Sequence, residues 1–234
     1  MDSNEIHPTV VIGPSVTFGR HNIVLPYSVI LGPAVIGDDN WIGPHVSIGT
    51  PAQYRSRPHT AIEDVQGVGV AIGNNNRIRE YVTIHQGSIR ETQIANDCFL
   101  MAYSHIPHDA TLENGVTLAN AAQMGGYTWL GEGANIGLGV DIRQRAAIGP
   151  YAMVGMNSTV TSDVPPFSLA MGSPARIGGA NRIGLQRNSV MDDPLIGRVH
   201  AHYLSGTTDP PDFLTGELAE MIDRFISHSG AANG

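Results

Sequence analysis

His108 and the aspartate that follows it, Asp109, are the pair in this sequence best suited to acid–base chemistry. An imidazole with the ordinary histidine pKa of about 6.5 can accept a proton at neutral pH, and a carboxylate beside it can fix its tautomer or stabilise the imidazolium. Gly126 and Gln144 follow His108 at successive intervals of 18 residues. A glycine lets a substrate approach the backbone, and its N–H can bind an oxyanion. We therefore expect a reaction in which a hydroxyl or amine loses a proton.

The interval of 18 is three times a shorter period that runs through the chain. An aliphatic or aromatic residue recurs at every sixth position over long stretches, and many of these residues are followed by glycine. A period of six fits neither an α-helix nor simple strand alternation, but it suits short strands separated by tight turns. The first unbroken run consists of Ile6, Ile12, Phe18, Val24, Ile30, Ile36, Ile42 and Ile48.

The repeat predicts an all-β fold, a left-handed parallel β-helix built from hexapeptide repeats. Three strands close a triangular coil of about 18 residues, and successive coils pair as parallel sheets about 4.8 Å apart. A collagen helix is excluded because glycine has no period of three, and a leucine-rich repeat needs a longer unit. In this fold His108, Gly126 and Gln144 form one column on an outer turn, where we expect an exposed imidazole. Side chains that are adjacent in a strand diverge, which weakens the expected contact between His108 and Asp109.

The chain divides into a predicted β-helix over residues 1–177 and a C-terminal extension over residues 178–234. Two segments, 49–71 and 85–93, interrupt the period, and excursions from a solenoid often carry function. A weak amphipathic pattern predicts a short helix near residues 212–227. We expect this helical tail to cap the open end of the prism, where unpaired strand edges favour aggregation.

Composition narrows the function classes. The net charge of -8 argues against non-specific binding to nucleic acid, and no apolar run is long enough to span a membrane. The only cysteine, Cys98, has no partner for an internal disulfide, which fits the cytoplasm. No Ser-His-Asp pattern, Walker loop or dinucleotide fingerprint is present.

A zinc site is a further possibility that the spacing of histidines disfavours. His105 and His108 are three residues apart, not five as in zinc-binding β-helices of the carbonic anhydrase type, so we predict no metal.

Three segments resemble the UDP-N-acetylglucosamine O-acyltransferases of lipid A synthesis. These are NRIREYVTIHQG at residues 76–87, LMAYSHIPHD at residues 100–109 and DVPPF at residues 163–167. The resemblance covers nearly the whole repeat region. It implies a homotrimer with active sites between subunits, an acyl carrier protein as acyl donor, a UDP-sugar as acceptor and no cofactor.

The resemblance also implies roles for individual residues. His108 would be the general base with Asp109 as its partner, and Gly126 would supply the oxyanion N–H. Substrate contacts are implied for a further set, in which His85 and His105 line the site, Gln144 contacts the sugar, Asn181 and Arg187 contact donor and nucleotide, and Met156 limits the length of the acyl chain.

The sequence departs from the family in several places. The family segment QDLK reads Gln53 to Ser56 here and lacks the acidic and lysine contacts to the acceptor, and Tyr127 replaces a family histidine. Residues 172–176, GSPAR, resemble the ending of hexapeptide transferases that use acetyl-CoA. Two alternatives therefore stay open. One is a CoA-dependent acyltransferase acting on another nucleotide sugar or a natural product, and the other is a non-catalytic β-helix scaffold. The column of His108, Gly126 and Gln144 disfavours the scaffold.

A cluster of arginines adds one more hypothesis. The chain has no lysine, and several of its arginines gather in the C-terminal part of an acidic protein. Such a patch could bind an acidic carrier protein or a nucleotide phosphate. Its members are Arg143, Arg145, Arg176, Arg182 and Arg187.

Overall fold

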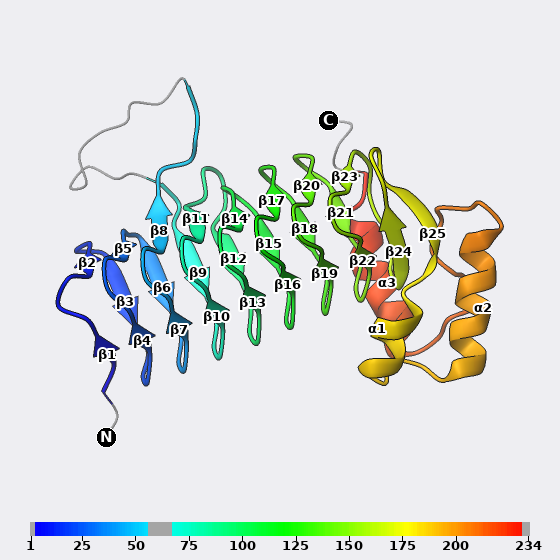
Figure 1. Ribbon diagram of the computed structural model, residues 1–234, viewed down its shortest axis with the longest axis horizontal. Coiled ribbons are helices and arrows are strands. Elements are labelled where there is room, and N and C mark those ends of the chain that lie inside the picture. The colour runs from blue at the N-terminus through cyan, green and yellow to red at the C-terminus, as the bar shows by residue number, and fades with distance from the viewer. Residues whose placement is uncertain (1–2, 56–66, 231–234) are drawn as a thin grey trace.

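The computed structural model describes residues 3–55 and 67–230, and it shows a left-handed parallel β-helix followed by a small helical extension (Figure 1). Each coil contributes one short strand to each of three sheets, which form the three faces of a triangular prism. Register confirms the period, because Thr111 pairs with Trp129 and Leu112 with Leu130. The fold that the sixfold spacing predicts is therefore confirmed.

The strands of the described residues divide among three sheets, which we call A, B and C. Sheet A contains β1 (Glu5–Ile6), β4 (Ile23–Val24), β7 (Trp41–Ile42), β10 (Arg77–Ile78), β13 (Phe99–Leu100), β16 (Thr117–Leu118), β19 (Asn135–Ile136), β22 (Met153–Val154), β24 (Ser168–Met171) and β25 (Arg176–Ala180). Sheet B contains β2 (Val11–Ile12), β5 (Val29–Ile30), β8 (Ser47–Thr50), β11 (Thr83–His85), β14 (His105–Ile106), β17 (Gln123–Met124), β20 (Asp141–Ile142) and β23 (Thr159–Val160). Sheet C contains β3 (Val16–Phe18), β6 (Ala34–Ile36), β9 (Val70–Ile72), β12 (Thr92–Ile94), β15 (Thr111–Leu112), β18 (Trp129–Leu130) and β21 (Ala147–Ile148).

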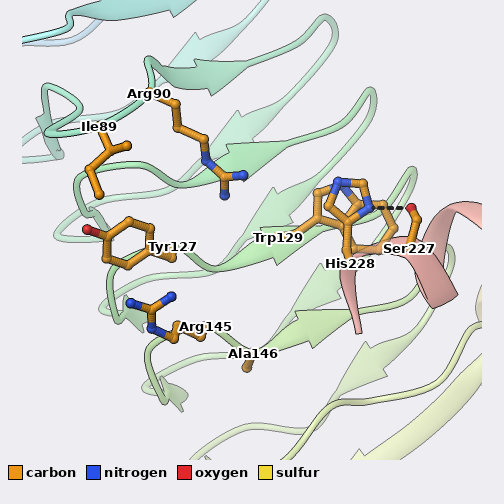
Figure 2. A pocket seen from close by; sticks show the side chains of 8 residues that line it. All are labelled: Ile89, Arg90, Tyr127, Trp129, Arg145, Ala146, Ser227 and His228. Carbon is orange, nitrogen blue, oxygen red and sulfur yellow. Dashed lines mark hydrogen bonds between the residues drawn. The ribbon is translucent and has the colours of Figure 1, made fainter. Parts of the chain in front are cut away.

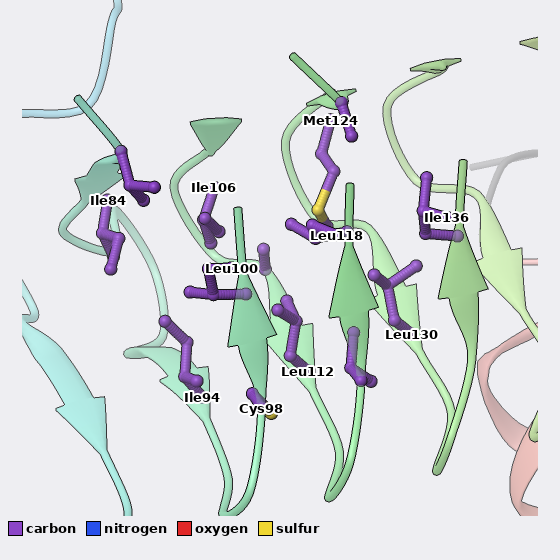
Figure 3. Close-up of a cluster of buried hydrophobic side chains, with 14 of the residues drawn as sticks. Ile84, Ile94, Cys98, Leu100, Ile106, Leu112, Leu118, Met124, Leu130 and Ile136 are labelled. Carbon is purple, nitrogen blue, oxygen red and sulfur yellow. The ribbon is translucent and has the colours of Figure 1, made fainter. Parts of the chain in front are cut away.

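The repeated aliphatic side chains fill the interior of the prism, as Figure 3 shows for the middle coils. Ile84, Ile106 and Leu130 are completely buried. Burying such a side chain contributes about 1.5–3 kcal/mol relative to leaving it exposed, so the stack is the main source of stability. Ile6 and Ile12 are exposed, in contrast to the rest of the series, because they lie in the first coil and no further coil covers them.

Both predicted excursions leave the prism between the sheet B strand and the sheet C strand of one coil, in two coils that are neighbours. The first connects β8 to β9, and its residues 56–66 lie outside the described residues. The second connects β11 to β12 and remains close to the coil, where Gly87 bridges to Gly69. These two segments bring additional side chains to the corner between sheets B and C.

The C-terminal extension begins within β25, which contains residue 177 and turns back antiparallel to β24. Three helices follow, α1 (Arg182–Arg187), α2 (Asp193–Leu204) and α3 (Glu217–His228), of which α3 corresponds to the predicted helix. The expectation that this helix caps the prism is only partly right. The end is covered mainly by β25 and α2, whereas α3 also packs Phe225 against Trp129 and Ala147 on sheet C. None of the described helices is long and apolar enough to cross a membrane.

Candidate active site

His108 and Asp109 lie on the turn between β14 and β15, at the corner between sheets B and C. Asp109 has a φ of 61°, in the left-handed region. Such a turn breaks the alternation of a strand, and the two neighbouring side chains converge. His108 Nδ1 lies 2.6 Å from Asp109 Oδ2. The expectation that the two side chains diverge is therefore wrong, because both residues belong to a turn and not to a strand.

The carboxylate of Asp109 is completely buried and fully engaged in hydrogen bonds. Its Oδ1 accepts from the backbone N–H groups of Ser88, Ile89 and Arg90 at 3.0, 2.8 and 2.8 Å. Its Oδ2 accepts from the Ser88 hydroxyl at 2.6 Å. Burial by itself would raise the pKa of Asp109, but these hydrogen bonds and the one from His108 outweigh it and lower the pKa to about 2. Excursion 85–93 thus holds an ionised carboxylate against the imidazole.

His108 is more enclosed than the sequence suggested. Its side chain is 14% exposed, although an outer turn led us to expect an exposed imidazole. The ring of Tyr54 lies 4.6 Å from it, centroid to centroid, and Tyr127 meets it edge-on at 5.1 Å. Tyr54 comes from the first excursion and Tyr127 from the next coil, so only the tertiary structure reveals this cover. A partly dry environment strengthens the polar interactions of the imidazole.

Tyr54 and Tyr127 belong to the site although the sequence did not predict a role for either residue. The Tyr54 hydroxyl lies 2.8 Å from that of Tyr127, 3.2 Å from Ser88 Oγ and 3.2 Å from His108 Nδ1. Burial is the main cause that raises the pKa of Tyr54, so the phenol is neutral at pH 7. The sequence offered one indication of their importance. Both tyrosines occupy positions where the resembled family has charged or ionisable residues that contact the substrate. The two tyrosines connect the first excursion to the His108–Asp109 pair.

Gly126 packs directly beneath the imidazole. A Cβ atom at this position would come within 2.5 Å of His108 Cε1 and 2.7 Å of His108 Nε2, closer than any real contact. The glycine is therefore required by the close approach of the ring. Its carbonyl accepts from Arg145, but its N–H donates to no acceptor in the described part of the chain. This N–H is a free donor beside the Nε2 edge of His108, as an oxyanion site needs.

His85 and His105 form a second pair on the outer side of sheet B. Their rings meet edge-on at 4.8 Å, and Thr83 Oγ1 lies 2.8 Å from His105 Nδ1. Burial, followed by the nearby His105 and His108, lowers the pKa of His85 to about 4, and burial and His108 also lower the pKa of His105. Both rings are therefore neutral at pH 7. His85 Nδ1 is buried without a hydrogen-bond partner, which suits a polar ligand atom.

The structure brings together only part of the predicted site. Gln144 lies on the turn stacked beyond Gly126 and is exposed. Met156 is 66% exposed and follows β22 of sheet A, so it occupies a different corner from His108. Asn181 caps α1 by accepting from Gly184 N–H, and it donates to the carbonyl of Tyr151. These contacts give Asn181 a structural role whatever it binds.

Asn181 and Arg187 line a cavity of about 720 Å³ on sheet A, beside Met153 and Leu169. His108 belongs to the corner between sheets B and C, so a single chain does not place this cavity next to the imidazole. Within the described ranges no group of three or more histidine, cysteine or acidic side chains could hold a metal ion.

Comparison with known proteins agrees with this geometry. A sequence model described as UDP N-acetylglucosamine O-acyltransferase, domain 2, matches residues 163–203. The acyl-[acyl-carrier-protein]–UDP-N-acetylglucosamine O-acyltransferase of Thermodesulfovibrio yellowstonii is 40% identical over 216 residues, which are 82% of this chain and 80% of that protein. The Synechocystis enzyme of the same name is 36% identical over 86% of this chain and 70% of its own length.

Solved structures show the same similarity in three dimensions. The UDP-N-acetylglucosamine acyltransferase of Bacteroides fragilis superposes with a TM-score of 0.77 at 27% identity, covering 97% of this chain and 96% of that one. The corresponding enzyme of Campylobacter jejuni gives a TM-score of 0.75 at 28% identity, with coverage of 96% and 91%.

Proposed function

This chain belongs to the UDP-N-acetylglucosamine O-acyltransferase family, and we propose that it moves an acyl group from an acyl-carrier-protein thioester to a hydroxyl of UDP-N-acetylglucosamine with His108 as general base. The donor and the acceptor are those in the names of its relatives. The observation that carries the mechanism is the 2.6 Å contact between His108 and an ionised Asp109, directly above the free N–H of Gly126.

The ionised carboxylate of Asp109 supports one tautomer of His108. It accepts a hydrogen bond and cannot donate one, so the imidazole carries its proton on Nδ1 and presents an unprotonated Nε2. That nitrogen removes the proton of the acceptor hydroxyl while the oxygen attacks the thioester carbonyl carbon. The carbonyl oxygen becomes an oxyanion, which the Gly126 N–H stabilises.

Collapse of the tetrahedral intermediate completes the transfer. The carbon–sulfur bond breaks, and the electron pair leaves with sulfur as a thiolate. His108, now an imidazolium held by Asp109, returns its proton to the sulfur, and the ester product and free thiol depart. A thioester is already activated, so the proposed reaction uses neither a cofactor nor a covalent enzyme intermediate.

A homotrimer completes the proposed site. The cavity with Asn181 and Arg187 lies on sheet A, whereas His108 lies at the corner between sheets B and C. In the proposed trimer, three prisms pack around a threefold axis so that sheet A of one subunit faces the corner of its neighbour that carries His108, the catalytic corner. Closed symmetry of this kind is the common solution for homo-oligomers. Light scattering that shows a stable monomer at micromolar concentration contradicts this arrangement.

Mass spectrometry of reaction mixtures tests the function directly. UDP-sugar acceptors are paired with donors carried either by acyl carrier protein or by CoA. We expect product from UDP-N-acetylglucosamine and acyl carrier protein. Turnover with CoA donors alone would establish the alternative suggested by residues 172–176, and no product from any pair would leave a scaffold.

A further inference from the structure

A cavity of about 280 Å³ lies beside the catalytic corner, between sheet C and the end of α3 (Figure 2). Arg90 comes from the second excursion, and Tyr127 and Arg145 lie on successive turns in the column of Asp109. The cavity is smaller than the range of about 300–1,000 Å³ that is usual for whole ligands, so it suits one group of a larger substrate. Its other walls are formed by Ile89, Trp129, Ala146, Ser227 and His228.

Two guanidinium groups face this cavity without an acidic partner. Arg90 donates through Nε and Nη2 to the carbonyl of Asp109 at 3.1 and 2.9 Å, and Arg145 lies over the ring of Tyr127 at 4.5 Å. Neither forms a salt bridge within residues 3–55 and 67–230. By contrast, Arg224 pairs with Glu132 at 3.2 Å. In a chain of net charge -8, two unpaired arginines at one cavity leave a site for an external anion.

The opposite wall is formed by two stacked rings, those of Trp129 and His228. Trp129 is 2% exposed, and the ring of His228 stacks on it at 4.5 Å with an interplanar angle of 7°. Phe225 of α3 packs against the same tryptophan, which fixes the end of the helix on sheet C. Figure 2 shows the arginines beside Tyr127 and the stacked pair across the cavity. This wall of the cavity is thus formed by packed side chains.

Tyr127 connects the cavity to the reacting groups. The guanidinium of Arg145 lies over its ring, and the ring also contacts that of His108 edge-on at 5.1 Å between centroids. Arg90 donates to the backbone of Asp109, the partner of His108. A ligand group bound by the two arginines therefore lies next to the proposed acyl-transfer site. We expect it to be part of a substrate that also extends to His108.

We propose that Arg90 and Arg145 form a subsite for a phosphate group of a substrate, an inference that rests on the proposed acyl transfer. Guanidinium groups bind phosphate oxygens through paired hydrogen bonds, and both substrates of that reaction carry phosphate. One source is the diphosphate of the nucleotide sugar. The other is the phosphodiester that attaches the thiol-bearing arm to the carrier protein.

Binding of inorganic pyrophosphate, measured by calorimetry without turnover, tests the subsite. Arg145→Gln should weaken pyrophosphate binding roughly 10- to 100-fold, the effect of losing hydrogen bonds to a charged group, and Arg145→Lys should weaken it less. Arg79→Gln is the matched control, because Arg79 also lies over an aromatic ring, that of Trp41, but pairs with Glu80. Thermal melts establish that each variant folds.

Two further titrations separate the sources. If the nucleotide occupies the subsite, Arg145→Gln weakens UDP binding to a similar extent. If the carrier arm occupies it, the variant abolishes the preference for acyl-phosphopantetheine over acyl-pantetheine. Either result supports the subsite, and unchanged binding of pyrophosphate and of both substrate arms overturns it. Pyrophosphate binding that depends on Arg145 in a chain without acyl transfer refutes the proposed function alone.

Discussion

Replacing Asp109 by asparagine tests whether the ionised carboxylate directs the chemistry of His108. The amide oxygen can take the place of Oδ1 and accept the three backbone N–H groups of residues 88–90. The amide NH₂ then replaces Oδ2, where it faces His108 Nδ1 and the Ser88 hydroxyl. Because NH₂ donates, the imidazole must accept through Nδ1 and carry its proton on Nε2. That tautomer cannot remove a proton from the acceptor.

The expected loss of activity is large and the expected loss of stability is moderate. Holding the wrong tautomer lowers kcat about 10⁴-fold in the Ser-His-Asp triad, and we expect a fall of about 10²- to 10⁴-fold here. The folded pKa of about 2 lies below the usual value of about 3.9 for a free aspartate. The ionised carboxylate therefore stabilises the native state by roughly 2–3 kcal/mol at neutral pH. That amount is smaller than the typical stability of a domain, about 5–15 kcal/mol, so Asp109→Asn should fold.

The sign of the pH dependence follows from the lowered pKa. The contribution of Asp109 is present above about pH 4 and is lost as the pH falls toward 2. The wild-type protein should therefore lose more stability than Asp109→Asn over this interval, as measured by denaturant unfolding. Asp39→Asn is the matched control, because Asp39 also has a left-handed φ, 60°, and contacts a histidine, His21, at 3.2 Å.

The assay combines kinetics with nitrogen-15 NMR of the histidine rings, which reports the tautomer of His108. Asp109→Asn should shift the proton to Nε2, whereas Asp39→Asn should leave His108 and kcat unchanged. A variant of Asp109 that retains more than about a tenth of wild-type activity would show that the carboxylate does not direct the base.

Four other substitutions test neighbouring parts of the site. His108→Ala should lower kcat about 100- to 10,000-fold, and light scattering should show that the oligomer remains intact. Gly126→Ala should displace the imidazole, since its Cβ would lie 2.5 Å from the ring, and kcat should fall with a nearly unchanged melting temperature. Tyr54→Phe removes the hydroxyl oxygen that lies 3.2 Å from His108 Nδ1 and should lower kcat about 2- to 10-fold, with no change in the oligomer. Met156→Gly should lengthen the preferred acyl chain with little loss of stability, because Met156 is 66% exposed. An unchanged profile in competition among donors of graded length would contradict the expectation that Met156 limits the acyl chain.

The sequence by itself determined the repeating architecture of this protein. Inward aliphatic positions such as Ile106, Leu118 and Leu130 recur with a fixed spacing, and each coil makes the same contacts with its neighbours. A local period is therefore enough to define the global fold. The same spacing places His108 and Gly126 in one column, because residues one coil apart are neighbours in space.

Only the tertiary structure decided how the site is assembled. The contact between His108 and Asp109 depends on a left-handed turn, and the periodicity of strands predicts the opposite. Ser88 and Tyr54 reach the site from the two excursions, which have no period from which a position could be inferred. The amphipathic pattern predicted the α3 helix. Its packing against Trp129, however, depends on contacts between segments far apart in the chain. A period specifies where its own members lie, whereas irregular segments are positioned by long-range packing and hydrogen bonds that no local pattern encodes.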